Sequence, residues 1–221
     1  KNAELDTFSH TVAHDLKNPL AHMVSLSDLL IEELSSDISE QGYTCLKHIL
    51  DSSKKMISIV NTLLLLAKVS KQEVTLTPLD MQDIIYRVQQ RLDLMIQQHQ
   101  AKFVIPDKWP TAIGYAEWIE EVWVNYFTNG LKYGGKPPHL EIGAVENQDT
   151  IRFWVKDNGN GLEQASIDKL FTQFTRLQAS IEGYGLGLSI VKHIIGKLGG
   201  EVGVESQIGT GCVFYFTLPK S

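Results

Sequence analysis

Glycine is distributed very unevenly along the 221 residues of this chain. Of the 17 glycines, only Gly42 lies in residues 1–70, and all the others lie in residues 71–221. Proline follows the same division, since Pro19 is the single proline of the first part. Glycine disfavours helix interiors but permits tight turns and close approach of backbones. We therefore expect a helical first part, followed by a part that mixes helices, strands and glycine loops.

Residues 1–70 carry the apolar spacing of two long helices. Over residues 46–67 apolar side chains recur at alternating steps of three and four, which is the pattern of a coiled coil or a helical bundle. A similar stripe runs over residues 5–30, and the polar segment 35–40 predicts a short turn that makes the helices antiparallel neighbours. A lone hairpin cannot bury both stripes, so we expect two chains to form a dimeric four-helix bundle. The alternative is a hairpin that packs on its own second domain.

The first helix also presents a polar face. At about 100° per residue, His14 points away from the centre of the apolar stripe. His10 and Asn18 lie one turn before and after it, and Asp15 lies on the adjacent flank. An imidazole that faces water beside a carboxylate and an amide has no packing role, so His14 is a candidate for chemistry. An ordinary surface histidine is the alternative.

The second part alternates helix and strand signals. Apolar side chains at helical spacing predict a helix over residues 81–98. Strict alternation of apolar and polar side chains predicts four strands, at residues 139–145, 150–156, 200–204 and 212–218. The expected domain limits are residues 1–70 for the helical part, 71–79 for a linker and 80–221 for an α/β domain.

A cluster of polar side chains lies at residues 125–133. Asn125 and Asn129 are four residues apart and hence on one helical face, and Lys132 follows one turn later. Amide oxygens are hard ligands that suit a hydrated Mg²⁺, and a nearby lysine suits phosphate. Alternatively, the two asparagines only cap the helix or form hydrogen bonds within it.

Two glycine-rich clusters follow. Asp157–Gly161 comes directly after a predicted strand, where a buried carboxylate could accept a hydrogen bond from an exocyclic amine; a simple turn is the alternative. Gly183–Gly187 precedes an apolar helix over residues 190–198, where backbone N–H groups can face a phosphate. This second cluster is not a Walker A motif, because it lacks the Gly-Lys-Ser/Thr ending.

Composition excludes several classes of protein. A net charge of −6 argues against general affinity for nucleic acid or anionic lipid, since phosphate binding is mostly cationic electrostatics. No apolar run approaches the roughly 20 residues of a membrane-spanning helix, so we expect no membrane contact by this part of the chain. Cys45 and Cys212 form no metal-like spacing and indicate two reduced thiols in an intracellular protein.

Taken in order, the motifs resemble those of the sensor histidine kinases of two-component systems. Residues 8–20 are similar to the phosphoacceptor box of that family, and residues 125–133 to its asparagine box. The later boxes follow in the order of the family, with the first glycine box at 157–161, the phenylalanine box at 171–176, the second glycine box at 183–187 and the usual ending at 209–219. The resemblance covers essentially the whole chain.

The resemblance implies a fold and a function. Its fold would be a dimerising helical hairpin followed by an α/β sandwich of the type shared with gyrase and Hsp90. Such a chain binds ATP with Mg²⁺, forms a homodimer and passes phosphate to an aspartate of a response regulator. Because the chain begins without methionine, we expect it to be a cytoplasmic fragment with a sensor domain upstream, in a full-length protein that can be membrane-anchored.

The resemblance also assigns catalytic residues. His14 would be phosphorylated, and Asp15 would take its proton or hold its tautomer. Asn18 would position water for the reverse, phosphatase activity. Arg176 would offset the charge that develops on the transferred phosphoryl group.

Nucleotide-binding residues follow in the same way. Asn125 and Asn129 would place Mg²⁺ on the triphosphate, and Lys132 would add positive charge there. Tyr133 would line the adenine pocket, and Asp157 would accept a hydrogen bond from the adenine amine. The glycine motifs would let the backbone approach the nucleotide, at Gly159, Gly161, Gly183, Gly185, Leu186 and Gly187.

Other interpretations remain open from the residues alone. His10 is a rival acceptor on the same face as His14, although Asp15 and Pro19 frame His14. A degenerate kinase acting as a dimeric scaffold would fold identically but would not incorporate phosphate. An ATPase or clamp related to gyrase and Hsp90 would share the nucleotide pocket but has no reason to carry residues 8–20. A protein-serine kinase would need different motifs.

Overall fold

The computed structural model describes residues 2–33, 39–167, 170–171 and 187–221; within these ranges the side chains of residues 2–15, 33 and 165 are not described. Contacts between Cα atoms divide the chain into two compact units, Lys1–Lys68 and Val69–Ser221. The helical part and the α/β part predicted from the glycine distribution are therefore distinct bodies.

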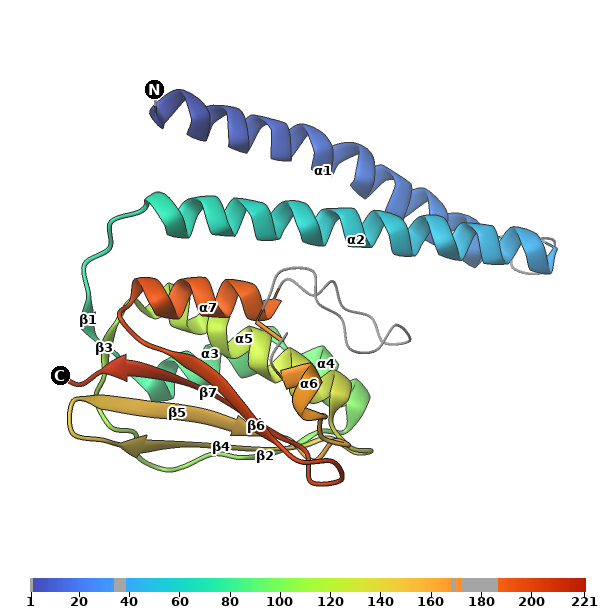
Figure 1. The fold of residues 1–221 in the computed structure, drawn as a ribbon. Helices are drawn as coiled ribbons and strands as arrows, with labels where there is room; N and C mark the ends of the chain where they lie inside the picture. The colour runs from blue at the N-terminus through green and yellow to red at the C-terminus, as the bar shows by residue number, and fades with distance from the viewer. Residues whose placement is uncertain (1, 34–38, 168–169, 172–186) are drawn as a thin grey trace. The chain divides into compact units, whose positions relative to one another are not determined.

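The first unit consists of two long helices that run in opposite directions (Figure 1). Helix α1 spans Asn2–Glu33, and α2 spans Glu40–Lys71 and so ends just inside the second unit. The predicted turn at residues 35–40 lies mostly outside the described residues. Large apolar side chains are exposed on both helices, namely Leu16, Met23, Leu26, Leu29, Leu30, Ile49, Met56 and Leu63. None of the described helices is long and apolar enough to cross a membrane.

The second unit is built on a five-stranded sheet with the strand order β2-β4-β5-β7-β6. β2 pairs with β4 in parallel, and the other pairs are antiparallel. The strands are β2 (Lys102–Val104), β4 (His139–Glu146), β5 (Thr150–Lys156), β6 (Val202–Ser206) and β7 (Cys212–Pro219). A separate antiparallel pair consists of β1 (Thr77–Pro78) and β3 (Ile113–Gly114).

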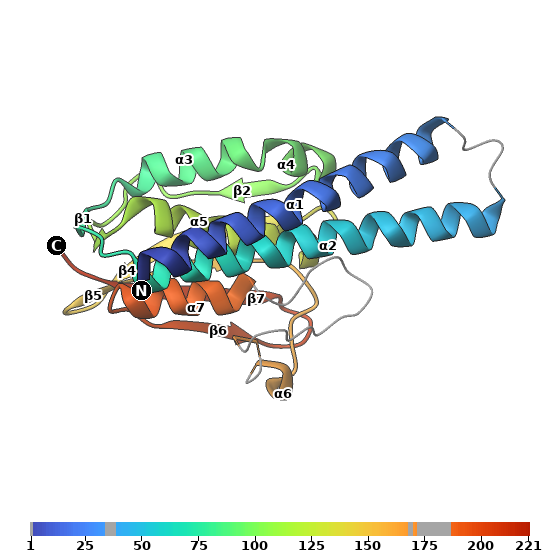
Figure 2. The ribbon, with the colours of Figure 1, turned by 90° about the horizontal axis from the view of Figure 1, so that it is seen from above.

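Helices cover one face of this sheet, which makes a two-layer α/β sandwich. α3, α5 and α7 lie side by side over the strands in both views (Figures 1 and 2). The helices of this unit are α3 (Met81–Arg91), α4 (Asp93–His99), α5 (Ala116–Tyr133), the short α6 (Gln164–Ile167) and α7 (Gly187–Lys197). The expectation of an α/β sandwich after a helical region is confirmed.

Aromatic side chains of α5 fix this helix to the sheet. Trp123 is fully buried, with its ring centroid 5.2 Å from that of Phe216 on β7. Tyr126 is also fully buried, and its hydroxyl donates a hydrogen bond of 2.9 Å to the carbonyl of Tyr215. Burial raises the pKa of Tyr126, so the hydroxyl stays protonated and remains a donor. The aromatic face of α5 is thus held against the sheet, and Asn125, Asn129 and Lys132 lie on another face of the helix.

Gly130 explains why α5 can lie so close to β4. A Cβ at this position would come within 2.5 Å of Leu140 Cδ2 on that strand. Leu140 is fully buried, so a larger residue at this position would force the leucine side chain to move within a packed core. The helix nevertheless continues to Tyr133, where the amide of Gly134 donates to the Gly130 carbonyl at 2.9 Å.

One predicted helix is wrong in its extent. Residues 81–98 form two helices, α3 and α4, because the backbone turns at Leu92 with φ −104° and ψ 7°. The Leu92 amide donates to the carbonyls of both Val88 and Gln89, which closes α3 with a tightened last turn. Apolar spacing continues across this break and therefore does not reveal it. The four predicted strands agree with β4, β5, β6 and β7 to within two residues.

Candidate functional site

A buried carboxylate lies where β5 ends. Asp157 is 5% exposed, and its Oδ1 accepts hydrogen bonds from the amides of Gly159 (2.8 Å) and Cys212 (3.2 Å). Burial raises the pKa of Asp157, and the two backbone hydrogen bonds oppose that rise. Both of these bonds use Oδ1, so Oδ2 is the oxygen available to a ligand among the contacts of the described residues.

The loop after Asp157 is joined to the hairpin between β6 and β7. The Asp157 amide donates to the Cys212 carbonyl at 2.9 Å, and the Gly209 amide donates to the Asn160 carbonyl at 2.7 Å. Gly211 has φ +83°, and a Cβ there would lie 2.0 Å from the Asp157 carbonyl oxygen. Only glycine permits this approach, so the hairpin forms a fixed wall beside the carboxylate.

Ser206 completes this connection. Its Oγ accepts a hydrogen bond from the Leu162 amide and donates one to the Gly211 carbonyl, both at 2.8 Å. The neighbouring Cys212 is 7% exposed, and burial raises the pKa of its thiol to about 11. The thiol therefore stays protonated near neutral pH and acts as a packing group beside Asp157.

Close backbone contact also joins this loop to the end of α5. A Cβ on Gly159 would come within 2.4 Å of the Tyr133 carbonyl oxygen, so this position requires glycine. At Gly161, φ is +70° and a Cβ would meet the Gln207 carbonyl oxygen at 2.1 Å. The structure thus brings Tyr133, Asp157, Gly159 and Gly161 together, as a nucleotide pocket at these residues requires.

Asn125 lies against the start of α7. Its Nδ2 donates to the Glu121 carbonyl at 2.8 Å, which leaves Oδ1 as an acceptor. A Cβ on Gly187, the first residue of α7, would come within 2.2 Å of that Oδ1. The asparagine cluster and the end of the second glycine cluster therefore meet. Asn129 and Lys132 are half-buried on the same face of α5, one and two turns after Asn125.

The structure describes only some of the other predicted site residues. His14 and Asp15 lie within the described backbone of α1, but their side chains are not described. Asn18 lies on α1 and is exposed. The remaining predicted residues lie outside the described residues altogether, namely Arg176, Gly183, Gly185 and Leu186.

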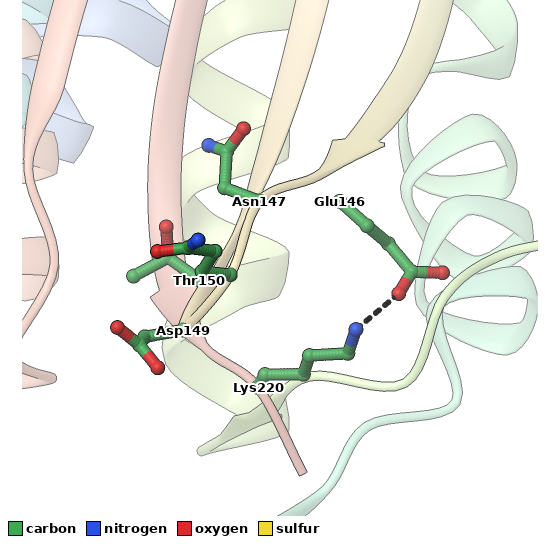
Figure 3. A pocket seen from close by; sticks show the side chains of 6 residues that line it. Glu146, Asn147, Asp149, Thr150 and Lys220 are labelled. Atoms are coloured by element: carbon green, nitrogen blue, oxygen red, sulfur yellow. Dashed lines mark ion pairs between the residues drawn. The ribbon is translucent and has the colours of Figure 1, made fainter.

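A polar hollow lies at the opposite end of β5 from Asp157 (Figure 3). Six side chains line it, from Glu146–Thr150 in the turn between β4 and β5 and from Lys220. Lys220 reaches across and pairs with the Glu146 carboxylate. The length of β5 separates this hollow from the buried carboxylate, so the two are different places on the molecule.

Sequence reasoning missed three contributors to the site. Ser206 and the Cys212 amide belong to the last hairpin, some 50 residues beyond Asp157. Gly211 lies in the Gly-Thr-Gly segment that ends the family pattern, and this segment was the one available signal for the hairpin. That Gly211 lies against Asp157 could not be predicted without the antiparallel pairing of β5 with β7.

Comparison with known protein families agrees with this arrangement. Residues 4–72 match the His Kinase A (phospho-acceptor) domain. Residues 114–221 match the family described as histidine kinase-, DNA gyrase B- and HSP90-like ATPase. The chain belongs to the histidine kinases. It carries a phosphoacceptor domain followed by an ATP-binding catalytic domain of that family.

Curated relatives extend the likeness along nearly the whole chain. It is 31% identical over 222 residues to cyanobacterial phytochrome B of Nostoc sp.. This alignment covers 98% of this chain and 30% of the relative. It is 30% identical over 222 residues to the methanogenesis regulatory histidine kinase FilI of Methanothrix harundinacea, which covers 99% of this chain and 25% of the relative. This histidine kinase chain thus spans less than a third of the length of these relatives.

Solved structures share the fold. Full-length ShkA in complex with AMPPNP matches with a TM-score of 0.70 at 22% identity, over 96% of this chain and 45% of ShkA. Histidine kinase ThkA in complex with response regulator protein TrrA matches with a TM-score of 0.65 at 19% identity, over 100% of this chain and 64% of ThkA. At these identities the likeness concerns the fold of the histidine kinase chain.

The raised pKa of Asp157 predicts how stability depends on pH. In the folded state this carboxyl holds its proton to higher pH than the usual value of 3.8, so ionisation disfavours folding as the pH rises through that window. Asp157→Asn keeps an oxygen for both amides and removes the charge. Without nucleotide, we expect this variant to be more stable than wild type at about pH 7.

Urea unfolding followed by tryptophan fluorescence measures this difference, because all four tryptophans lie in the second unit. The advantage of Asp157→Asn should shrink as the pH is lowered toward 3.8. An advantage of the same size at every pH, or a loss of stability at neutral pH, would contradict the assignment of a destabilising charge to this carboxylate.

Proposed function

We propose that this chain phosphorylates itself on His14 with ATP and passes the phosphoryl group to an aspartate of a response regulator. One observation carries the proposal: a phosphoacceptor domain and an ATP-binding domain of the histidine kinase family occur together in the chain. The buried Asp157 beside glycine loops supports the second half of that assignment. The AMPPNP complex of ShkA adds support, since AMPPNP is an analogue of ATP.

In the proposed nucleotide site, Asp157 recognises the base. The free oxygen of its carboxylate accepts a hydrogen bond from the exocyclic amine of adenine. A buried carboxylate distinguishes between bases, because a base with an acceptor in place of the amine would leave the charge of Asp157 without a hydrogen-bond donor. Gly159 and Gly161 bring the backbone close to the base, and Tyr133 lines the pocket edge.

Asn125 and Asn129 are proposed to hold Mg²⁺ on the triphosphate. The donor set fits, because Asn125 uses its Nδ2 within the helix and keeps Oδ1 directed toward the start of α7. Bound Mg²⁺ would neutralise charge on the phosphates during transfer. Lys132 adds positive charge one turn later, and the proposed phosphate loop at Gly183, Gly185, Leu186 and Gly187 runs into the N-terminus of α7.

The proposed reaction has two transfers. A ring nitrogen of His14 attacks the γ-phosphorus, a new N–P bond forms, and the bond to the bridging oxygen breaks to release ADP. Asp15 holds or accepts the proton of the other ring nitrogen, which frees the attacking lone pair. Arg176 offsets charge on the phosphoryl group in flight. An aspartate oxygen of the regulator then takes the phosphoryl group, and His14 recovers its neutral ring.

The proposal includes two protein partners. Exposed Leu26 and Leu63, at 60% and 55%, belong to an apolar surface that a second copy of the hairpin would cover in a four-helix bundle. A response regulator is the second partner, which the ThkA–TrrA complex supports by likeness of fold. Because ATP is the phosphoryl donor, the proposal places this part of the chain in the cytoplasm.

Removal of the acceptor tests the first transfer. With γ-labelled ATP and Mg²⁺, we expect His14→Gln to lose its acid-labile label down to background, because no other nitrogen occupies the framed position. His10→Gln is the matched control on the same helix and should retain most of its label. Chelation of Mg²⁺ should abolish labelling of wild type.

Two outcomes would contradict this assignment. Substantial label on His14→Gln would mean that another side chain is the acceptor. A well-folded wild-type chain that binds ATP but takes up no label would instead be a dimeric signalling scaffold.

We also propose phosphatase activity toward the phosphorylated regulator, with Asn18 positioning the attacking water. Asn18 is exposed on α1, one turn after His14. Its amide can both donate to and accept from water, and Asn18→Ala removes both functions. We expect phosphate on a preloaded regulator to persist longer with Asn18→Ala than with wild type, while labelling of His14 continues. Equal decay rates would show that Asn18 has no such role.

A further inference from the structure

The loop between α5 and β4 depends on a side chain from another part of the chain. Its sequence is Gly-Gly-Lys-Pro-Pro over residues 134–138. The glycines are intrinsically flexible, and the two prolines have no amide proton to donate. Backbone hydrogen bonds hold only its two ends, since the Gly134 amide donates to the Gly130 carbonyl of α5 and the Pro138 carbonyl accepts from the Lys102 amide of β2, both at 2.9 Å.

Asn158 supplies the missing partners. Its Oδ1 accepts hydrogen bonds from the amides of Gly135 (2.9 Å) and His139 (2.8 Å), on either side of the prolines. Its Nδ2 donates to the Pro137 carbonyl at 3.1 Å. Two amide donors converge on one atom of the side chain, so that atom is the oxygen and the orientation of the carboxamide is fixed.

Close packing accompanies these bonds. A Cβ on Gly135 would lie 2.6 Å from Asn158 Nδ2 and 2.9 Å from its Cγ, so the loop can approach this side chain only with glycine there. Gly159, the residue after Asn158, is packed as closely, since a Cβ on it would clash with the Tyr133 carbonyl oxygen. Residues 157–159 therefore contact, in turn, the β6–β7 hairpin, the loop after α5 and the end of α5 itself.

We propose that Asn158 is a positioning residue of the nucleotide site, a role that rests on the proposed function above. Its carboxamide sets the distance between Asp157, at the base end, and the last turn of α5, which carries Lys132 and Tyr133. Asn158 itself is exposed, and among the described residues its carboxamide forms hydrogen bonds with the backbone of Gly135, Pro137 and His139. Loss of the carboxamide frees the middle of the loop, at Gly135 and Pro137, and lets the two sides of the pocket separate.

The test combines nucleotide binding with amide exchange on the 221-residue chain. By calorimetry, we expect Asn158→Ala to weaken ATP binding about fivefold or more. By NMR, the amides of Gly135 and His139 should exchange about tenfold faster in this variant, while amides in the core of α5 keep their protection. A merely structural residue would lower protection throughout the domain.

Three further variants sharpen the test. Asn158→Asp keeps the oxygen that both amides use but loses the donor to the Pro137 carbonyl, so it should restore most of their slow exchange. Gly135→Ala displaces the same side chain from the opposite side and should weaken ATP binding as Asn158→Ala does, which keeps the proposal testable if Asn158→Ala folds poorly. Asn147→Ala, in the exposed turn at the far end of β5, is the matched control and should leave both measurements unchanged.

ATP binding by Asp157→Asn distinguishes a failure of the positioning role from a failure of the proposed nucleotide site. If Asp157→Asn loses ATP binding but Asn158→Ala and Gly135→Ala bind like wild type, the positioning role is wrong and the proposed function stands. If Asp157→Asn itself binds ATP like wild type, the nucleotide site is misplaced and the role of Asn158 is overturned with it.

Discussion

One carboxylate oxygen holds the catalytic domain's candidate site together. Asp157 Oδ1 accepts the amide of Gly159, in its own loop, and the amide of Cys212, on the last strand. Burial of a carboxylate is costly, and hydrogen bonds from backbone amides offset part of that cost. Burial raises the pKa of Asp157 by more than the two backbone hydrogen bonds lower it, so they offset only part of the cost. In the proposed nucleotide site, a hydrogen-bond donor of the ligand would offset more of that cost at the remaining oxygen.

Helix α5 connects this carboxylate to the proposed phosphate end of the site. Its aromatic face is fixed by Trp123 and Tyr126 against the sheet, so its polar face has little freedom to rotate. Asn125 on that face approaches the first residue of α7, and Tyr133 at its end approaches Gly159. A rigid helix thus sets the spacing between the proposed base end and the proposed phosphate end of the pocket. Rigid support of this kind is what phosphoryl transfer requires, because positioning supplies much of the catalysis.

Features encoded by a few adjacent residues could be predicted from the sequence, whereas features that depend on contacts between distant residues could not. The strands and the glycine clusters carry their periodicity and composition in a few adjacent residues, so sequence sufficed for β5 and for the loop at Asp157. The single helix predicted over residues 81–98 is divided at Leu92, and no glycine or proline there indicates the division. Gly130 depends on Leu140, which becomes its neighbour only when α5 packs on β4. Asn158 depends on the loop of residues 134–138, which comes near it only when β4 pairs with β5. The roles assigned to His14, Asp15 and Arg176 stay predictions.

Base selectivity tests the central claim most directly, because it depends on Oδ2 of Asp157, the oxygen that accepts no hydrogen bond from the described residues. Inosine triphosphate carries a carbonyl where adenine carries the exocyclic amine, so it would set an acceptor against that carboxylate. By calorimetry, the account predicts that ATP binds at least about tenfold more tightly than inosine triphosphate to wild type. Equal affinity for the two nucleotides would contradict it.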